Sequence, residues 1–178
     1  MTKITILSGF GQEPETLKKV FNNKDVIALD YLQTKNFEDL LTQDLTAYDN
    51  EVVIGWSLGG QVAIRLIEKQ ILKPKLLILI ATPFQFIQNE INKVGVLREI
   101  FESFENILIF DKIEALNQLA YLSAGNDENS DLVFENMKPI KNTSNLNSWL
   151  QELKDFNCFN VDFKNFPKTI YVCATCSW

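Results

Sequence analysis

The sequence predicts an α/β fold in which a mostly parallel sheet is covered by helices. Three observations lead to this prediction. Short apolar runs alternate with helical patterns up to residue 83, a glycine-rich turn follows one of these runs at residues 55–60, and strand signals nearly disappear between residues 84 and 166. Strands that alternate with helices pair in parallel through crossover connections, and some eighty residues exceed what one crossover needs. We therefore expect a helical insertion within the sheet.

The strands are predicted from short runs rich in β-branched and aliphatic residues, which lie at residues 4–7, 25–29, 52–54, 75–81 and 169–174. The run at 75–81 is apolar at every position after Lys75. Such a continuous run is typical of a parallel strand that is buried on both faces. The other connections place helices on both sides of the sheet, so we expect both of its faces to be covered.

The helices are predicted from apolar residues at helical spacing, which recur after Pro14 and at about residues 36–47, 61–73, 87–104, 113–122 and 145–153. A polar loop is expected at 125–130.

The length of the chain predicts a single domain, because 178 residues are enough for one hydrophobic core. Its first core part spans 1–83, a helical cap or lid spans 84–166, and a final core strand spans 167–178. The alternative to a cap is a long crossover connection.

Composition excludes several classes of protein. Apolar residues make up 46% and charged residues 22%, as in ordinary globular proteins, and the net charge is −6. With only two arginines and no basic run, nucleic-acid binding is not expected. No apolar run is long enough to cross a bilayer and the N-terminus enters a strand at once, so we expect a cytoplasmic protein without a membrane partner.

The three cysteines fit a reducing compartment. Cys173 and Cys176 form a C-x-x-C pair, which suggests redox or zinc chemistry, but no second pair, histidine or following helix accompanies it. The sequence also lacks a dinucleotide fingerprint and a phosphate loop, and we expect neither a metal nor a cofactor.

The pattern that carries the functional prediction is Gly55-Trp56-Ser57-Leu58-Gly59, which has the form G-x-S-x-G. An apolar run precedes it and an amphipathic helical pattern follows it. A serine at such a strand-to-helix turn has a strained backbone and projects its hydroxyl at the carboxyl edge of the sheet. Ser57 is therefore the candidate nucleophile. The alternative is a glycine-rich turn with an incidental serine, and the flanking strand and helix make it less favourable.

These residues identify a family resemblance. The run Gly55 to Gly60, the loop Ser8-Gly9-Phe10-Gly11 and the helical insertion resemble the α/β-hydrolase superfamily, and within it the BioH-type carboxylesterases of biotin synthesis. The resemblance implies an α/β-hydrolase fold and hydrolysis of a carboxylic ester. For BioH-type enzymes the substrate is the methyl ester of pimeloyl-acyl-carrier protein.

The resemblance also implies roles for residues near the turn. Ser57 would attack the ester carbonyl, and the backbone N–H groups of Leu58 and Phe10 would bind the oxyanion. The side chains of Trp56 and Phe10 would line the acyl pocket, although simple packing explains both equally well. An acyl carrier protein is acidic, so Lys93 and Arg98 on the first cap helix are candidates for its contact; a solvated surface is the alternative.

The catalytic triad of the superfamily is incomplete here. Thr175, Cys176 and Ser177 stand where the acid is expected, and the sequence contains no histidine. Without a base, the serine hydroxyl is a weak nucleophile, so the chain should be inactive or nearly so.

Three accounts explain the missing base. The chain is a truncated or frameshifted esterase that lacks the last strand and helix, or a non-catalytic relative that binds an acyl group or a protein, or an enzyme whose histidine comes from a second chain. The absence of histidine excludes the third account for a homodimer. The first is favoured because acid, histidine and final elements are missing together.

Overall fold

The computed structural model describes residues 2–21, 25–124, 127–137 and 145–173. Its centre is a sheet of five parallel strands in the order β2-β1-β3-β4-β5. The strands are β1 (Ile4–Leu7), β2 (Val26–Ala28), β3 (Val52–Trp56), β4 (Leu76–Ile80) and β5 (Lys168–Val172). Each of the five predicted strands forms, and the parallel α/β architecture is confirmed.

The helices are α1 (Glu15–Val20), α2 (Phe37–Leu40), α3 (Leu58–Glu68), α4 (Arg98–Phe110), α5 (Lys112–Ala124), α6 (Asp127–Met137) and α7 (Leu146–Asp155). Short 3-10 turns occur at Tyr31–Gln33, Thr46–Tyr48, Cys158–Asn160 and Phe163–Asn165. None of the helices in the described ranges is long and apolar enough to span a membrane.

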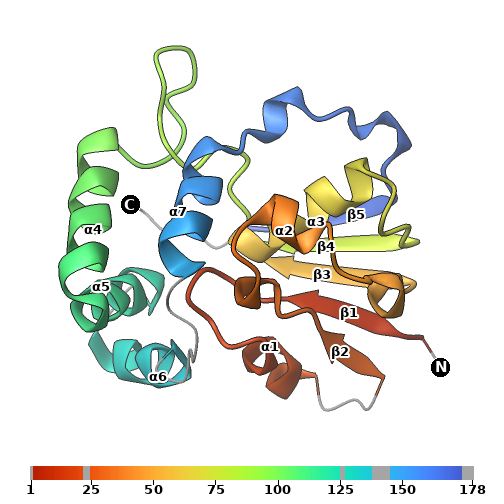
Figure 1. The fold of residues 1–178 in the computed structure, drawn as a ribbon, viewed down its shortest axis with the longest axis horizontal. Coiled ribbons are helices and arrows are strands. Elements are labelled where there is room, and N and C mark those ends of the chain that lie inside the picture. Colours follow the sequence, from red (N-terminus) through yellow and green to blue (C-terminus); the bar gives the residue numbers. More distant parts are fainter. Residues whose placement is uncertain (1, 22–24, 125–126, 138–144, 174–178) are drawn as a thin grey trace.

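The faces of the sheet are covered unequally. The chain moves from β1 to β2 in one direction along the sheet, and from β3 to β4 in the other. Because parallel crossovers are right-handed, α1 lies on one face, and α2 and α3 lie on the opposite face (Figure 1). The larger core cluster lies on the α3 face and includes residues of α4, α5 and α7, whereas the smaller cluster under α1 contains Ile6, Leu17, Val26 and Ile54.

Strand β4 corrects one prediction. Its residues alternate between partly exposed and buried, with Leu77 and Leu79 buried towards α3 and Ile78 and Ile80 half-buried on the other face. The prediction of burial on both faces was wrong for this strand because, within the described ranges, the helix on that face is the short α1, which packs mainly against β1 and β2. A continuous apolar run therefore does not prove that both faces are covered.

Two predicted helices differ in extent. The helix predicted at 36–47 forms only as α2, because the Asp44 side chain accepts hydrogen bonds from the backbone and hydroxyl of Thr46 and starts a new turn. The helix predicted at 87–104 begins at Arg98. The preceding loop is held by side chains instead, since the Gln85 amide donates to two carbonyls of the loop and Asn89 accepts from two of its N–H groups.

The predicted polar loop at 125–130 is also partly wrong. Residues 125 and 126 lie outside the described ranges, and α6 begins at Asp127.

Helix α7 joins the helical segment between β4 and β5 to the rest of the fold. It lies between the sheet and the pair α4–α5 (Figure 1). Trp149 of α7 is fully buried, its indole N–H donates to the Thr34 carbonyl at 2.8 Å, and its ring meets Tyr31 edge-on at 4.8 Å between centroids. On the same helix, Glu152 forms an ion pair with Arg65 of α3 at 2.6 Å. The sheet and the helical segment therefore share one core.

Candidate active site

The loops that follow β1 and β3 lie side by side at a topological switch point. The connection from β1 leads to β2 on one side, and the connection from β3 leads to β4 on the other. In open parallel sheets, ligands bind at such a point, beyond the carboxyl ends of the strands. A Cβ built on Gly9, in the loop after β1, would lie 3.4 Å from the Cβ of Ser57, in the turn after β3. The structure therefore brings together the two loops that the sequence singled out.

Ser57 occupies a strained turn between β3 and α3. Its backbone has φ 53° and ψ −122°, a conformation that a residue with a side chain adopts only when its surroundings enforce it. Its N–H donates to the Ile80 carbonyl at 2.9 Å, and its carbonyl accepts from Gly60 at 3.0 Å. Ser57 is the N-cap residue of α3, but its hydroxyl is not used to cap the helix start.

Close backbone contacts explain the glycines of the turn. A Cβ on Gly59 would lie 2.3 Å from the Leu7 carbonyl oxygen, and one on Gly55 would lie 2.4 Å from the Gly60 Cα. These distances are shorter than any side chain tolerates. The first turn of α3 is therefore packed directly on the end of β1, and this packing fixes the position of Ser57.

The loop Ser8–Gly11 is buried and internally hydrogen-bonded. The Gln12 N–H donates to the Gly9 carbonyl at 3.2 Å, and the Tyr31 hydroxyl donates to the Ser8 carbonyl at 2.7 Å. The N–H groups of Phe10, in this loop, and of Leu58, at the start of α3, have no recorded acceptor within the described part of the chain. Free N–H groups at a helix start are natural anion-binding groups.

The side chains of Phe10 and Trp56 make packing contacts. Phe10 is 5% exposed and meets Phe104 of α4 edge-on, with 6.4 Å between ring centroids. Trp56 is half-buried and belongs to the smaller core cluster, and its ring would lie 3.5 Å from a Cβ on Gly9. Both side chains are close to the Ser57 turn, and both contribute to the core.

The positions at which the triad acid is expected, 175–177, lie outside the described residues, as does Cys176. Cys173 is exposed after β5, and Cys158 is buried with a pKa raised to about 12 by its burial and by the charge of Glu68. A thiol of that pKa is inert at neutral pH. Among the described residues, no group of three or more side chains is arranged to hold a metal ion.

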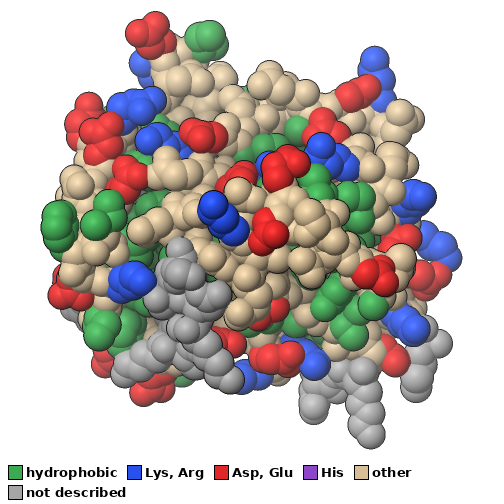
Figure 2. All heavy atoms as spheres, in the orientation of Figure 1, with side chains coloured by type: hydrophobic (Ala, Val, Ile, Leu, Met, Phe, Trp, Pro, Cys, Tyr) green, Lys and Arg blue, Asp and Glu red, His purple; other side chains and the backbone are tan. Residues whose placement is uncertain are grey.

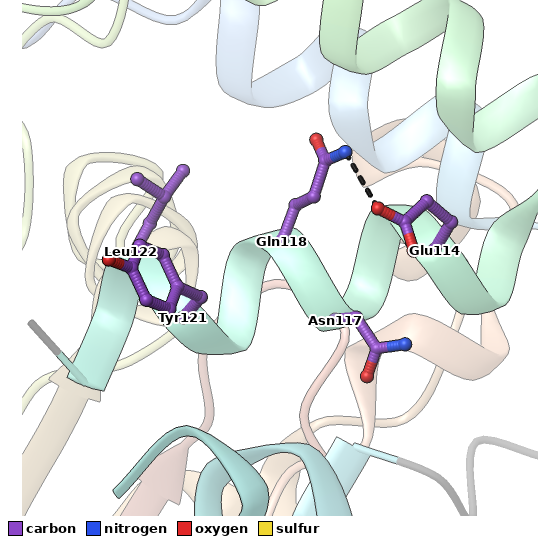
Figure 3. Close-up of a pocket in the computed structure, with 5 residues that line it drawn as sticks. All are labelled: Glu114, Asn117, Gln118, Tyr121 and Leu122. Atoms are coloured by element: carbon purple, nitrogen blue, oxygen red, sulfur yellow. Dashed lines mark hydrogen bonds between the residues drawn. The ribbon is translucent and has the colours of Figure 1, made fainter. Parts of the chain in front are cut away.

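Two surface hollows lie away from Ser57. One, of about 330 Å³, is lined by a single face of α5, where Gln118 donates to Glu114 at 2.9 Å (Figure 3). The other, of about 380 Å³, lies before and at the start of α4, where Lys93 and Arg98 are joined by Glu90 and Glu99. Lys93 belongs to the loop before α4, so its predicted position on a helix was wrong. Figure 2 shows acidic, basic and apolar side chains interspersed over one face of the molecule.

Solved structures share this arrangement of sheet and helices. An esterase from Exiguobacterium antarcticum superposes with a TM-score of 0.77 over 96% of this chain and 72% of its own, at 15% identity. The chain has the α/β-hydrolase fold. A hydrolase from Oleispira antarctica, olei00960, shares this α/β-hydrolase fold with a TM-score of 0.68 over 99% of this chain and 83% of its own, at 15% identity.

BioG from Haemophilus influenzae is also similar, with a TM-score of 0.58 and 19% identity over 84% of this chain and 64% of its own. No protein-family model and no curated protein sequence matches the chain. At these identities the likeness extends to the α/β-hydrolase fold.

Two residues beside the Ser57 turn were not identified from the sequence. Tyr31 reaches the loop after β1, and the Thr82 side chain fills the space next to Gly60, where a Cβ would lie 1.9 Å from the Thr82 hydroxyl oxygen. Tyr31 follows β2 and Thr82 follows β4, both at the carboxyl edge of the sheet. This position after a strand is the sequence signal that could have identified them. In open parallel sheets, ligands bind beyond this edge.

Proposed function

We propose that the chain carries the nucleophile and oxyanion groups of a serine ester hydrolase. The observation that supports this most is the φ of 53° at Ser57, in a turn packed against the loop that follows β1. Ser57 attacks the ester carbonyl, and the N–H groups of Phe10 and Leu58 stabilise the negative charge on its oxygen. The bond to the alcohol then breaks, and water releases the acyl group from Ser57.

The substrate class follows from the resemblance to BioH-type carboxylesterases. We propose an acyl ester, with the methyl ester of pimeloyl-acyl-carrier protein as the specific candidate. The hollow at Lys93 and Arg98 adds little support for an acidic carrier, because Glu90 and Glu99 balance its charge.

The absence of a histidine base determines the rate of ester hydrolysis that we expect. The chain contains no histidine, so no imidazole accepts the Ser57 proton, and we expect little or no turnover by this chain alone. An added base in solution supplies that function without changing the protein.

The test is acylation of Ser57 by p-nitrophenyl butyrate, with and without added imidazole, measured by intact-mass spectrometry. We expect imidazole to accelerate acylation, and the matched Ser57→Ala variant to remain unmodified at this position. A folded protein whose Ser57 is not acylated in either condition would contradict the proposal. Rapid acylation without imidazole would show that another group of the chain acts as the base.

The second candidate is a non-catalytic module that binds an acyl group or a protein, and the absence of histidine favours it. It predicts saturable binding of a butyrate ester analogue, measured by calorimetry, without acylation even in imidazole. The two candidates therefore give opposite results in the same experiment.

A further inference from the structure

We propose that Tyr31 is a positioning residue, whose hydroxyl holds the loop after β1 so that the Phe10 N–H points at the oxyanion. This inference rests on the proposed function, because it assigns the support of one of its two oxyanion donors. Tyr31 belongs to the 3-10 turn after β2 and is far from Ser57 in the sequence.

The Ser8 carbonyl is held from two sides. The Tyr31 hydroxyl donates to it at 2.7 Å in a buried hydrogen bond. From the other side, the oxygen approaches α3 so closely that a Cβ on Gly59 would lie 2.4 Å from it. A carbonyl confined in this way cannot rotate. The backbone that leads from Ser8 through Gly9 to the Phe10 N–H is therefore fixed relative to the first turn of α3.

Tyr31 is itself immobilised. Its side chain is 1% exposed, and its ring packs edge-on against Trp149 of α7 at 4.8 Å between centroids. The Trp149 indole N–H donates to the carbonyl of Thr34, three residues after Tyr31. Helix α7 thus supports the phenol that orients the oxyanion loop, although more than a hundred residues separate Thr34 from Trp149 in the sequence.

The phenol keeps its proton above the pH at which an exposed tyrosine loses it. Burial raises the pKa of Tyr31 well above its ordinary value, and the nearby charge of Asp30 raises it further. The hydroxyl proton needed for the hydrogen bond to Ser8 is therefore retained at alkaline pH. This agrees with a positioning role and makes a role as the missing base unfavourable, because a base must accept a proton.

The test replaces Tyr31 by Phe, which keeps the ring and its contact with Trp149 but removes the hydroxyl. The readout is the imidazole-assisted acylation of Ser57 as a function of ester concentration. We expect the limiting rate constant to fall about tenfold while the half-saturating concentration changes little, because the hydrogen bond acts on the transition state. The Phe10 amide resonance in a ¹⁵N–¹H spectrum should shift.

The matched control is Thr5→Val. Thr5 is fully buried in β1, and its hydroxyl donates to the Tyr48 carbonyl at 2.7 Å, at the opposite end of the strand from the loop. This variant loses that partly buried hydrogen bond and the acceptor of the Asn50 amide, and it should keep the acylation rate of the unmodified chain. Equal slowing in both variants would mean that lost stability explains the effect, and would overturn the positioning role.

The outcomes separate the two proposals. Acylation of the unmodified chain together with an unchanged rate in Tyr31→Phe overturns the role of Tyr31 and leaves the proposed function intact. Failure of Ser57 acylation in the folded unmodified chain overturns both.

Discussion

At the scale of single residues, the packing around Ser57 is set by backbone contacts. Gly59 touches the end of β1 so closely that no side chain fits, whereas a Cβ on Gly9 would make ordinary contacts at 3.4 and 3.5 Å with the side chains of Ser57 and Trp56. The two glycines therefore differ in function, although both belong to glycine-rich loops. Gly59 is required by the backbone packing, whereas a side chain at Gly9 would contact the side chains of Ser57 and Trp56.

Substituting these glycines should separate stability from reactivity. We expect Gly59→Ala to lower the free energy of unfolding by about 3 kcal/mol or more, because the added methyl group overlaps the Leu7 carbonyl. Gly9→Ala should change stability by less than about 1 kcal/mol but slow the imidazole-assisted acylation of Ser57. Denaturant titrations and intact-mass kinetics measure the two effects. Equal stability losses would contradict the geometry.

The thiols give a second test at this scale. Cys158 is 1% exposed with a pKa of about 12, and Cys173 is exposed. At pH 8, iodoacetamide should modify Cys173 in the folded chain and Cys158 only after unfolding, as peptide mapping would show. Because burial raises the pKa of Cys158 above its unfolded value, its contribution to stability is present below pH 9 and is lost as the pH rises towards 12.

At the scale of elements, α7 is held to the core by a half-buried ion pair. Arg65 of α3 contacts Glu152 at 2.6 Å, its guanidinium lies 3.6 Å from the centroid of the Phe37 ring, and Glu152 also accepts from the Phe37 N–H at 3.2 Å. The three elements α2, α3 and α7 therefore meet at one carboxylate. Because the pair is partly buried, removing one of its charges should cost more stability than removing one from a surface pair.

Glu152→Gln tests this junction. The amide preserves the size of the side chain but removes its charge, so we expect a loss of about 1–2 kcal/mol in unfolding free energy, measured by denaturant titration. Lys75→Gln, which breaks the exposed ion pair between Lys75 and Glu51, is the matched control and should have no measurable effect. A larger effect in the control than in Glu152→Gln would be inconsistent with the burial of the α7 pair.

The elements that the sequence predicted well are those with local signals. The five strands, α1, α3, α5 and α7 were placed from apolar spacing, and the turn at Ser57 was placed from its glycines. The loop at 86–97 was mistaken for helix because its apolar residues keep helical spacing, while the Gln85 side chain, buried among the loop's carbonyls, decides its conformation. Such hydrogen bonds from a side chain to the backbone leave no periodic pattern in the sequence.

The candidate site shows the same difference between residues with a local sequence motif and residues placed by distant contacts. Ser57 was identified from its own motif, whereas Tyr31 was not, because its contact with Ser8 joins segments 23 residues apart. The burial of β4 on only one face also depends on which helices the connections place there. A strand's own composition does not contain that information.

At the scale of the whole molecule, the face of the sheet opposite α3 carries an apolar strip that no helix covers within the described part of the chain. Ile78 pairs with Ile170 and Ile80 pairs with Val172, and the two β5 residues are 43% and 45% exposed. Exposed apolar edges of this kind favour association between chains.

The strip should govern solubility. The double variant Ile170→Thr and Val172→Thr keeps strand propensity while adding hydroxyl groups, so we expect lower light scattering and weaker binding of the dye ANS, with an unchanged circular dichroism spectrum. Leu77→Thr, at a fully buried position on the other face of the same sheet, should instead destabilise the fold. Unchanged scattering in the double variant would assign any association to another surface.

The pairing of β5 with β4 also bears on how fast the chain folds. Its partners lie about ninety residues apart in the sequence, whereas β1, β2 and β3 find one another across much shorter intervals. Closing so long a loop carries a large entropy cost, and topologies with such high contact order fold slowly. We therefore expect the last strand to pair only after the helical segment has packed against α3, with β4 as the edge of the sheet until then.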